Sequence, residues 1–429
     1  MAPDKQNLEV NCKALIALLG AGKVYLHGSS GYNASVASYF SPQAAALHPA
    51  CFVAPQTAHD VAAVVKSLAS ADHGGPQDFA VRGGGHTWFA DANNSPGGVT
   101  IDLRGLRTIT VSADSTSVSV GAGATWDVIY GKLDTLGRSV AGGRVAGVGI
   151  GGLTLGGGFE VVLADGNIIE ASETENSELW WALRGGSNNF GVVTRIDYRT
   201  FEQGLLWYTM IFNPLSTVDK QIAIYADLMS PQKYDVNASY LTGWAYSAKQ
   251  GLTSALVQIP QASQYMTSTV TFEPIEAMIK ETYAAFNKSL PYVQNVTQIS
   301  WALNLEPLPP QIYDAQGGSG ANALGLTGQK GRSLVMCLIS VSWSDATQNQ
   351  QVYDATRALM DNISACAKNL GVFDPYIYLN YAAPWQDVIS SYGVESVAKL
   401  RRVRDKYDPN FVFTKQVAGG FKIPDELSM

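Results

Sequence analysis

The sequence predicts an α+β fold in two regions of different character. Residues 51–86 alternate an apolar strand, an amphipathic helix and a second apolar strand, which is the pattern of a βαβ unit. Residues 159–172 form a hairpin pattern around Asp165-Gly166, a favoured two-residue turn. After residue 204, apolar strands alternate with long amphipathic helices, which predicts a sheet covered by helices.

Boundary residues define the elements of the first region, which ends near Gln203. Thr57, with Asp60 three residues later, is typical of a capped helix start, and residues 73–76 break that helix. We expect strands at Cys51–Ala54, Phe79–Val81 and Val192–Tyr198, two strands of hairpin character at Val99–Leu103 and Ser117–Val120, and helices at Val61–Leu68 and Trp126–Leu136, the latter between Thr125 and Gly137.

The second region has less glycine and more Trp, Tyr and Met. Residues 317–331, dense in Gly, Ser, Ala and Gln, predict a mobile loop. The expected elements are strands at Leu205–Phe212, Leu334–Val341 and Tyr376–Tyr381, and helices at Val218–Met229, Ile275–Asn287, Gln350–Leu370 and Val394–Lys406, the last stopped by Asp408-Pro409.

Composition narrows the classes of function. The net charge is −7 and no basic cluster exceeds Arg401-Arg402, which argues against nucleic acid or an anionic membrane as a partner. No apolar run reaches the eighteen residues of a membrane span. Four cysteines without CxxC spacing and five scattered histidines give no metal pattern. Residues 1–10 do not resemble a signal peptide, although six Asn-X-Ser/Thr sequons hint at secreted ancestry, so the compartment stays open.

The segment Val81–His86, VRGGGH, is the most informative local feature. Three consecutive glycines favour neither helix nor strand, but they allow a backbone to approach a ligand closely with its N–H groups directed outward. A histidine at the end of such a loop is a candidate for acid–base chemistry or covalent attachment. The alternative is a tight turn followed by a surface histidine with no special role.

A second glycine block spans residues 142–158, where nine of seventeen positions are glycine. Residues 147–152 match GxGxxG, but a dinucleotide fold of the Rossmann type needs a helix directly afterwards, and a hairpin follows instead. A backbone that lines a long phosphate-bearing ligand explains the block better. The alternative is a glycine-rich connection packed against a sheet.

Eight motifs in fixed order carry a resemblance to a known family. Together they resemble the FAD-linked oxidases of the vanillyl-alcohol oxidase superfamily, in the branch of the berberine bridge enzyme and the fungal oligosaccharide oxidases. The resemblance extends from about Val24 to Phe421. The motifs are VRGGGH at 81–86, VGAGA at 120–124, GGRV at 142–145, GGLTLGGG at 151–158, VLADG at 162–166, WALRGG at 181–186, NFGVVT at 189–194 and YLNY at 378–381.

This resemblance implies FAD as the cofactor and a PCMH-type FAD-binding domain of two α+β subdomains. The implied organisation is an N-terminal segment at 1–46, the FAD-binding domain at 47–203, a substrate domain at 204–376 and a closing segment at 377–429 that completes the flavin site. His86 matches the flavin-linked histidine of the family. The other positions matched to flavin contacts are Arg82, Gly83, Gly84, Gly85, Thr87, Gly142, Gly143, Gly149, Gly151, Gly152, Leu153, Gly157, Val193 and Asn380.

Tyr378 and Tyr381 are the candidate catalytic residues, because the family pattern has tyrosines there. A base must remove the substrate's hydroxyl or amine proton as hydride moves to the flavin. Since an ordinary tyrosine has a pKa near 10, such a base needs a partner, which the sequence does not identify. The alternative is two core aromatic residues on a buried strand.

One departure from the family lies after Gly158. Relatives carry a further segment there with a second flavin-linking cysteine, whereas here Gly158 runs directly into Phe159 and no cysteine lies between Cys51 and Cys337. At most the His86 bond to the flavin therefore remains. Cys12 and Cys51 match a disulfide of secreted relatives, and they would be free thiols in a reducing compartment.

We therefore expect an FAD-dependent oxidase that oxidises an alcohol or amine carbon of a sugar or secondary metabolite and passes the electrons to O₂, giving H₂O₂. Its expected partners are a small-molecule substrate and O₂, with no metal, and we expect a monomer. A dehydrogenase with another acceptor is a close variant. The alternative of another class is a non-catalytic paralogue that keeps the fold as a ligand-binding protein, which the lost segment favours.

Overall fold

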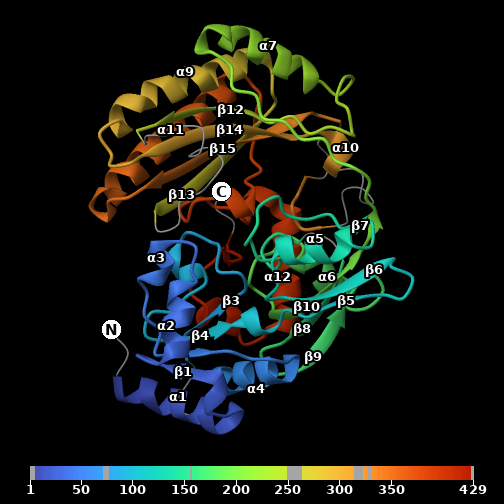
Figure 1. Cartoon of the computed structure of the whole chain (residues 1–429), viewed down its shortest axis with the longest axis vertical. Coiled ribbons are helices and arrows are strands. Elements are labelled where there is room, and N and C mark those ends of the chain that lie inside the picture. Colours follow the sequence, from blue (N-terminus) through green and yellow to red (C-terminus); the bar gives the residue numbers. More distant parts are fainter. Residues whose placement is uncertain are drawn as a thin grey trace. The chain divides into compact units, whose positions relative to one another are not determined.

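The computed structural model describes residues 5–70, 77–154, 157–248, 263–313, 322–326 and 331–426. The chain divides into two compact units, Met1–Leu206 with Val394–Met429, and Trp207–Gly393 (Figure 1). The first division lies close to the boundary expected after residue 203. Residues 377–393, which the sequence assigned to the closing segment, cluster with the second unit.

The first unit contains a four-stranded sheet in the order β1-β2-β4-β3, in which β4 runs parallel to both β2 and β3. The βαβ unit is therefore present, with β4 inserted between its two strands. Helix α4 begins at a capping box of Thr57 and Asp60, as the sequence predicted, and buries Val61, Val65 and Leu68. The elements are β1 (Val24–Leu26), β2 (Cys51–Val53), β3 (Phe79–Arg82), β4 (Val99–Asp102), α1 (Lys5–Leu19), α2 (Ser30–Ala37), α3 (Pro42–Ala45) and α4 (Ala58–Ala69).

A five-stranded antiparallel sheet, β5-β6-β10-β8-β9, forms the second half of this unit. The hairpin at Asp165-Gly166 is confirmed, and α4 contacts β8, β9 and β10, which joins the two halves. The elements are β5 (Ile109–Val111), β6 (Ser117–Gly121), β8 (Gly158–Val162), β9 (Ile168–Ala171), β10 (Val192–Arg199), α5 (Trp126–Asp134), α6 (Ser177–Leu183), α12 (Val394–Tyr407) and α13 (Val412–Lys415), with β7 (Arg138–Ser139) paired to β11 (Phe201–Glu202).

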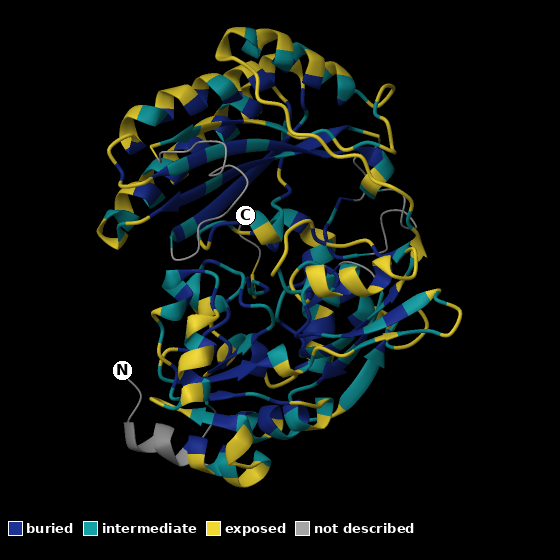
Figure 2. Ribbon diagram, viewed as in Figure 1, coloured by how far each residue is buried: buried dark blue, intermediate teal, exposed yellow. Residues whose placement is uncertain are grey.

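The second unit is an antiparallel sheet in the order β12-β14-β15-β13-β16 with long helices on one face, as expected (Figure 1). The strands are largely buried, while the outer faces of α7 and α9 are exposed (Figure 2). The elements are β12 (Thr242–Ser247), β13 (Gln264–Phe272), β14 (Ser300–Leu308), β15 (Leu334–Trp343), β16 (Phe373–Asp374), α7 (Val218–Leu228), α9 (Glu276–Val293), α10 (Pro310–Tyr313) and α11 (Asn349–Asn369).

Three predictions about strands need correction: in two places no strand forms, and in one the strand forms but pairs differently. The residues of Leu205–Phe212 form no strand and their side chains are exposed, 85% for Trp207, because an apolar run becomes a strand only beside a partner strand. The Val99–Leu103 strand pairs in the parallel sheet, and the hairpin partner of β6 is the three-residue β5, too short to be recognised. The Trp126–Leu136 helix ends at Asp134, two residues early.

The third correction concerns the strand predicted at Tyr376–Tyr381. This segment is extended and then forms a 3₁₀ helix at Leu379–Tyr381. Side chains accept hydrogen bonds from two backbone N–H groups of this segment: Asp374 accepts from Tyr376 and Ser391 Oγ accepts from Ile377. A neighbouring strand is therefore not required. The predicted helix break at 73–76 and most of the predicted loop 317–331 lie outside the described residues.

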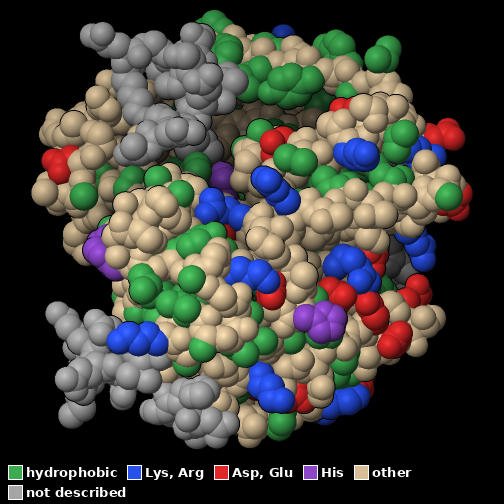
Figure 3. Space-filling view, turned by 60° about the horizontal axis from the view of Figure 1, so that its bottom comes forward, with side chains coloured by type: hydrophobic (Ala, Val, Ile, Leu, Met, Phe, Trp, Pro, Cys, Tyr) green, Lys and Arg blue, Asp and Glu red, His purple; other side chains and the backbone are tan. Residues whose placement is uncertain are grey.

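Cys12 and Cys51 form a disulfide that ties α1 to β2. Both cysteines are buried in the hydrophobic core of the first sheet. A closed loop of this length stabilises a fold by about 3–4 kcal/mol in the chain-entropy account. No helix among the described residues is long and apolar enough to cross a bilayer. On the face shown in Figure 3, Lys and Arg side chains are interspersed with Asp and Glu.

Candidate flavin site and catalytic residues

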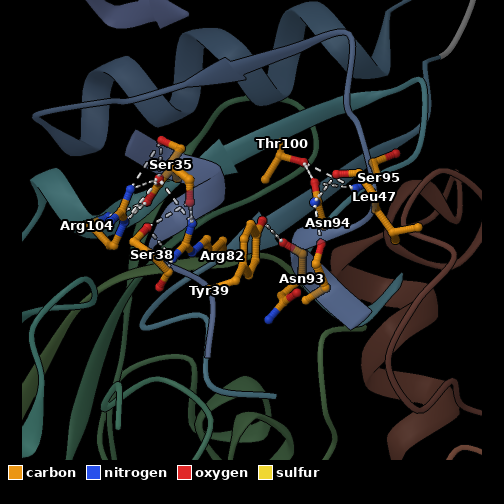
Figure 4. A network of polar contacts seen from close by, with 12 residues as sticks. Ser35, Ser38, Tyr39, Leu47, Arg82, Asn93, Asn94, Ser95, Thr100 and Arg104 are labelled. Atoms are coloured by element: carbon orange, nitrogen blue, oxygen red, sulfur yellow. Dashed lines mark hydrogen bonds and ion pairs between the residues drawn. The ribbon is translucent and has the colours of Figure 1, made fainter. Parts of the chain in front are cut away.

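Arg82, the last residue of β3, extends its side chain beside Gly85 to the end of α2. Its guanidinium is fully buried and donates to the carbonyl oxygens of Ser35 and Ser38 at 2.7 and 2.8 Å (Figure 4). It also lies 3.7 Å from Asp102 and 3.8 Å from the centre of the Tyr39 ring. Arg82 therefore fastens the loop to the end of α2, and these contacts occupy its guanidinium.

Gly84 and Gly149 bring the two glycine segments together. A Cβ on Gly84 would lie 2.5 Å from the backbone nitrogen of Gly149, and a Cβ on Gly149 equally close to that of Gly84. Gly85 has a φ of +71°, and a Cβ there would meet the Arg82 guanidinium. Only glycine fits these positions. The N–H groups of Gly84, Gly85 and His86 donate to no described residue.

His86 follows this loop and is half-buried, as is Thr87. Its ring stacks on Phe40, with centroids 3.9 Å apart and planes 16° from parallel. Burial lowers the pKa of His86 below its ordinary value of 6.5, so the imidazole is neutral at pH 7. A neutral imidazole keeps a nitrogen lone pair that can act as a nucleophile.

The remaining glycines of the block differ in what they do. Gly142 and Gly143 pack against the buried indole of Trp126, and a Cβ on either would collide with that ring. Gly157 has a φ of +96° and meets the Asp197 carbonyl of β10. These three are explained by packing. Gly83 and Leu153 are half-buried, Gly151 and Gly152 are exposed, and Val193 is half-buried on β10, where it pairs with Val161.

The second unit brings Tyr378, Asn380 and Tyr381 together on one turn. Tyr378 and Tyr381 meet edge to face at 4.8 Å, and Asn380 Nδ2 donates to the Tyr378 hydroxyl at 3.1 Å. The Tyr381 hydroxyl donates to the carboxylate of Glu306 at 3.0 and 3.2 Å. Glu306 lies on β14 and is 9% exposed. Tyr381 therefore has a proton acceptor.

Sequence reasoning missed Glu306 and Gln386. Glu306 interrupts the apolar end of β14, and an acidic residue in such a run is a usable signal. Gln386 fastens the tyrosine turn to β13: its Oε1 accepts from Ser268 Oγ, Thr269 N and Ala383 N, and its Nε2 donates to the Thr269 carbonyl. Nothing in the sequence around Gln386 indicates this role.

The first unit fits a flavin dinucleotide. Two glycine-rich loops lie side by side, and in one of them the N–H groups of Gly84, Gly85 and His86 have no described acceptor and can donate to phosphate oxygens; the neutral imidazole lies at the end of that loop. The described residues contain no group of three His, Cys, Asp or Glu side chains that could hold a metal ion.

Comparison with known proteins agrees with this geometry. Residues 49–168 match the family model described as an FAD binding domain. An FAD-dependent monooxygenase of Fusarium proliferatum is 33% identical, over 90% of this chain and 87% of its own. The chain belongs to the family of FAD-dependent oxidoreductases that carry this FAD binding domain. FAD is the cofactor of this flavoprotein.

A longer relative is the oligopeptidase PhomG′ of Diaporthe leptostromiformis, which is 37% identical over 96% of this flavoprotein but extends well beyond it, since the match covers 37% of its length. The alignment with the Fusarium protein runs over 454 positions, whereas 90% of 429 residues is about 386. That relative therefore carries segments that this flavoprotein lacks.

Solved structures share the fold. Glucooligosaccharide oxidase from Acremonium strictum, which carries a 6-S-cysteinyl, 8α-N1-histidyl FAD, matches with a TM-score of 0.70 at 20% identity, covering 96% of this chain and 100% of its own. The berberine bridge enzyme-like protein 1 of Physcomitrella patens matches with a TM-score of 0.74 at 18% identity, covering 97% and 99%. Covalent flavin thus occurs among the structural neighbours.

Proposed function

We propose that this flavoprotein is an oxidase that removes hydride from an alcohol or amine carbon of a sugar or secondary metabolite and returns the electrons to O₂ as H₂O₂. FAD supplies the hydride acceptor. The proposal includes a bond between the flavin and His86, because the imidazole is neutral and follows the glycine loop. The contact between Tyr381 and Glu306 carries the proposal.

Tyr381 is the proposed base. A phenol is a weak base at neutral pH, but its hydroxyl can take the substrate proton while passing its own proton to a carboxylate. The Glu306 oxygens at 3.0 and 3.2 Å are within hydrogen-bond reach for that transfer. Tyr378 ranks second because Tyr381 contacts a carboxylate directly, whereas the contact described for the Tyr378 hydroxyl is a hydrogen bond that it accepts from the Asn380 amide.

The experiment measures the rate at which the flavin absorbance bleaches when substrates are added without oxygen, across a panel of oligosaccharides, alcohols and amines. Tyr381→Phe should lower this rate by about 10²–10⁴-fold, the usual contribution of a general base. Glu306→Gln should also lower it, and Tyr378→Phe should lower it less. A Tyr381→Phe variant that bleaches at the wild-type rate would refute the assignment, and purified protein without flavin absorbance would refute the oxidase.

Monooxygenation is a second candidate, because curated relatives carry the name FAD-dependent monooxygenase. Turnover under ¹⁸O₂ separates the two: an oxidase leaves the label in peroxide, whereas a monooxygenase transfers one atom to the product. A dehydrogenase would bleach its flavin but release no peroxide. A flavin that no compound of the panel reduces would instead favour the non-catalytic ligand-binding paralogue.

A further inference from the structure

Residues 38–40, here called the strap, lie against the glycine loop of the first unit. Arg82 donates to Ser38 through both its carbonyl oxygen, at 2.8 Å, and its hydroxyl, at 2.9 Å. Tyr39 packs on the same guanidinium. The N–H of Phe40 donates to the Gly85 carbonyl at 3.2 Å. The strap and the loop are thus joined at all three strap residues.

The strap presents the Phe40 ring to the imidazole of His86. At a centroid separation of 3.9 Å and an interplanar angle of 16°, the Phe40 ring covers one face of the imidazole and leaves its edge, where both nitrogens lie, uncovered by this contact. The hydrogen bond from Phe40 N to Gly85 O holds the backbone beside the same pair. The plane of the imidazole is therefore fixed by a ring whose own backbone is anchored to the loop.

We propose that Phe40 is a positioning residue that orients the His86 imidazole for attachment to the flavin. The inference rests on the proposed His86 bond. In that reaction an imidazole nitrogen would bond through its lone pair to the 8α methyl carbon, a C–H bond of that methyl group would break and leave its electron pair behind, and the other ring nitrogen would lose its proton. The two protons and two electrons pass to the isoalloxazine ring, from which O₂ takes them as H₂O₂. A nitrogen held in one plane reaches that carbon more often than one on a freely rotating ring.

The contact with Phe40 also affects the protonation state of His86. Burial of His86 favours its neutral form, and Phe40 supplies part of that burial by covering one ring face. Without the ring, the imidazole would gain water and rotational freedom together. Both changes slow attachment without removing any group that holds the dinucleotide.

The test separates attachment from binding. Apoprotein is mixed with FAD, samples are precipitated in acid at intervals, and flavin retained in the washed pellet gives the rate of attachment. FAD affinity is measured by flavin fluorescence in the same variants made in a His86→Ala background. The variants are Phe40→Leu, which keeps apolar volume without a flat ring, and Phe40→Tyr, which keeps the ring. Phe201→Ala, an exposed aromatic residue of the same unit, is the matched control.

Phe40→Leu should attach flavin at least tenfold more slowly while its FAD affinity changes less than threefold, and Phe40→Tyr and Phe201→Ala should behave as wild type. Wild-type attachment by Phe40→Leu, or equal losses of rate and affinity, would overturn the positioning role. Wild-type protein whose flavin stays entirely in the supernatant would instead refute the His86 bond, so the two failures are distinguishable.

Discussion

The candidate site of the first unit is formed by backbone atoms, whereas that of the second unit is formed by side chains. In the first unit, backbone makes the site: Gly84 and Gly149 come together through main-chain atoms, and the N–H groups of Gly84, Gly85 and His86 donate to no residue that the structure describes. In the second unit, side chains make it: Tyr381 bonds to Glu306, and Gln386 fastens the turn that carries the tyrosine. Backbone of this kind suits a phosphate-bearing ligand, whereas the tyrosine–carboxylate contact can move a proton.

The difference decides how each site responds to substitution. A backbone site fails when a side chain is added where two main-chain segments touch, as at Gly84 and Gly149, because nothing flexible is present to move aside. A side-chain site fails when a partner is removed, because buried polar groups then lose their hydrogen bonds. The comparison thus predicts that insertion of atoms damages the first unit and deletion damages the second.

The largest effect should come from Gly84→Ala. The new methyl group would lie 2.5 Å from the Gly149 backbone, so the two loops must separate. We expect FAD affinity to fall by about 100-fold, or about 3 kcal/mol, measured by flavin fluorescence titration. Gly131→Ala on α5 is the control, because its Cβ meets nothing within 4 Å and alanine favours a helix. Equal affinities of the two variants would contradict the backbone-built site.

Gln386→Leu should give the next largest effect, in the second unit. The substitution leaves Ser268 Oγ and both backbone groups of Thr269 without their partner, and these residues are almost fully buried. Each buried polar group left without a hydrogen bond costs about 1–3 kcal/mol, and relaxation of neighbouring residues recovers part of this cost. We therefore expect the free energy of unfolding, measured in urea, to fall by about 3 kcal/mol. Gln350 lies at an exposed position of α11, and Gln350→Leu should change the free energy of unfolding by less than about 0.5 kcal/mol. Similar losses of stability from both variants would argue against the role of Gln386 in fastening the tyrosine turn to β13.

The same contrast explains what the sequence could reveal. The glycine loop, the capped start of α4 and the Asp165-Gly166 hairpin were all predicted from residues close together in the chain, and the structure contains all three. FAD binding was predicted by resemblance and is confirmed by the family. Turns, helix caps and glycine loops can be predicted from sequence because the residues that form them are neighbours in the chain.

The tyrosines of the second site were predicted by resemblance, but their partners were not, because these contacts are distant in sequence. Tyr381 and Glu306 are 75 residues apart, and Gln386 and Thr269 are 117 apart. The packing role of Gly142 and Gly143 was hidden for the same reason, since it depends on Trp126. The segment Tyr376–Tyr381 has the apolar content of a strand, but side chains of Asp374 and Ser391 take its backbone hydrogen bonds.

The smallest effect concerns Lys422, in the tail of the first unit. Its ammonium donates to Asn188 Oδ1 and the Phe413 carbonyl at 3.0 and 2.9 Å, and burial lowers its pKa from 10.5 to about 7 despite Asp408 and Asp91 nearby. In the second unit, burial instead raises the pKa values of Tyr225, Tyr265 and Cys337 away from neutrality. The first unit should therefore be the one whose stability changes with pH just above 7.

The direction follows from proton counts. Between about pH 7 and 10 the unfolded chain keeps the Lys422 proton and the folded chain has released it, so the free energy of unfolding rises with pH, by up to about 1.4 kcal/mol per unit. Below pH 7 both states are protonated and the slope vanishes. Urea unfolding of wild type and Lys422→Met, from pH 6 to 9, should diverge above pH 7, with the exposed Lys132→Met following wild type. Parallel curves for Lys422→Met and wild type would mean that the ammonium stays charged in the folded tail, so that the Asp408 and Asp91 carboxylates outweigh burial.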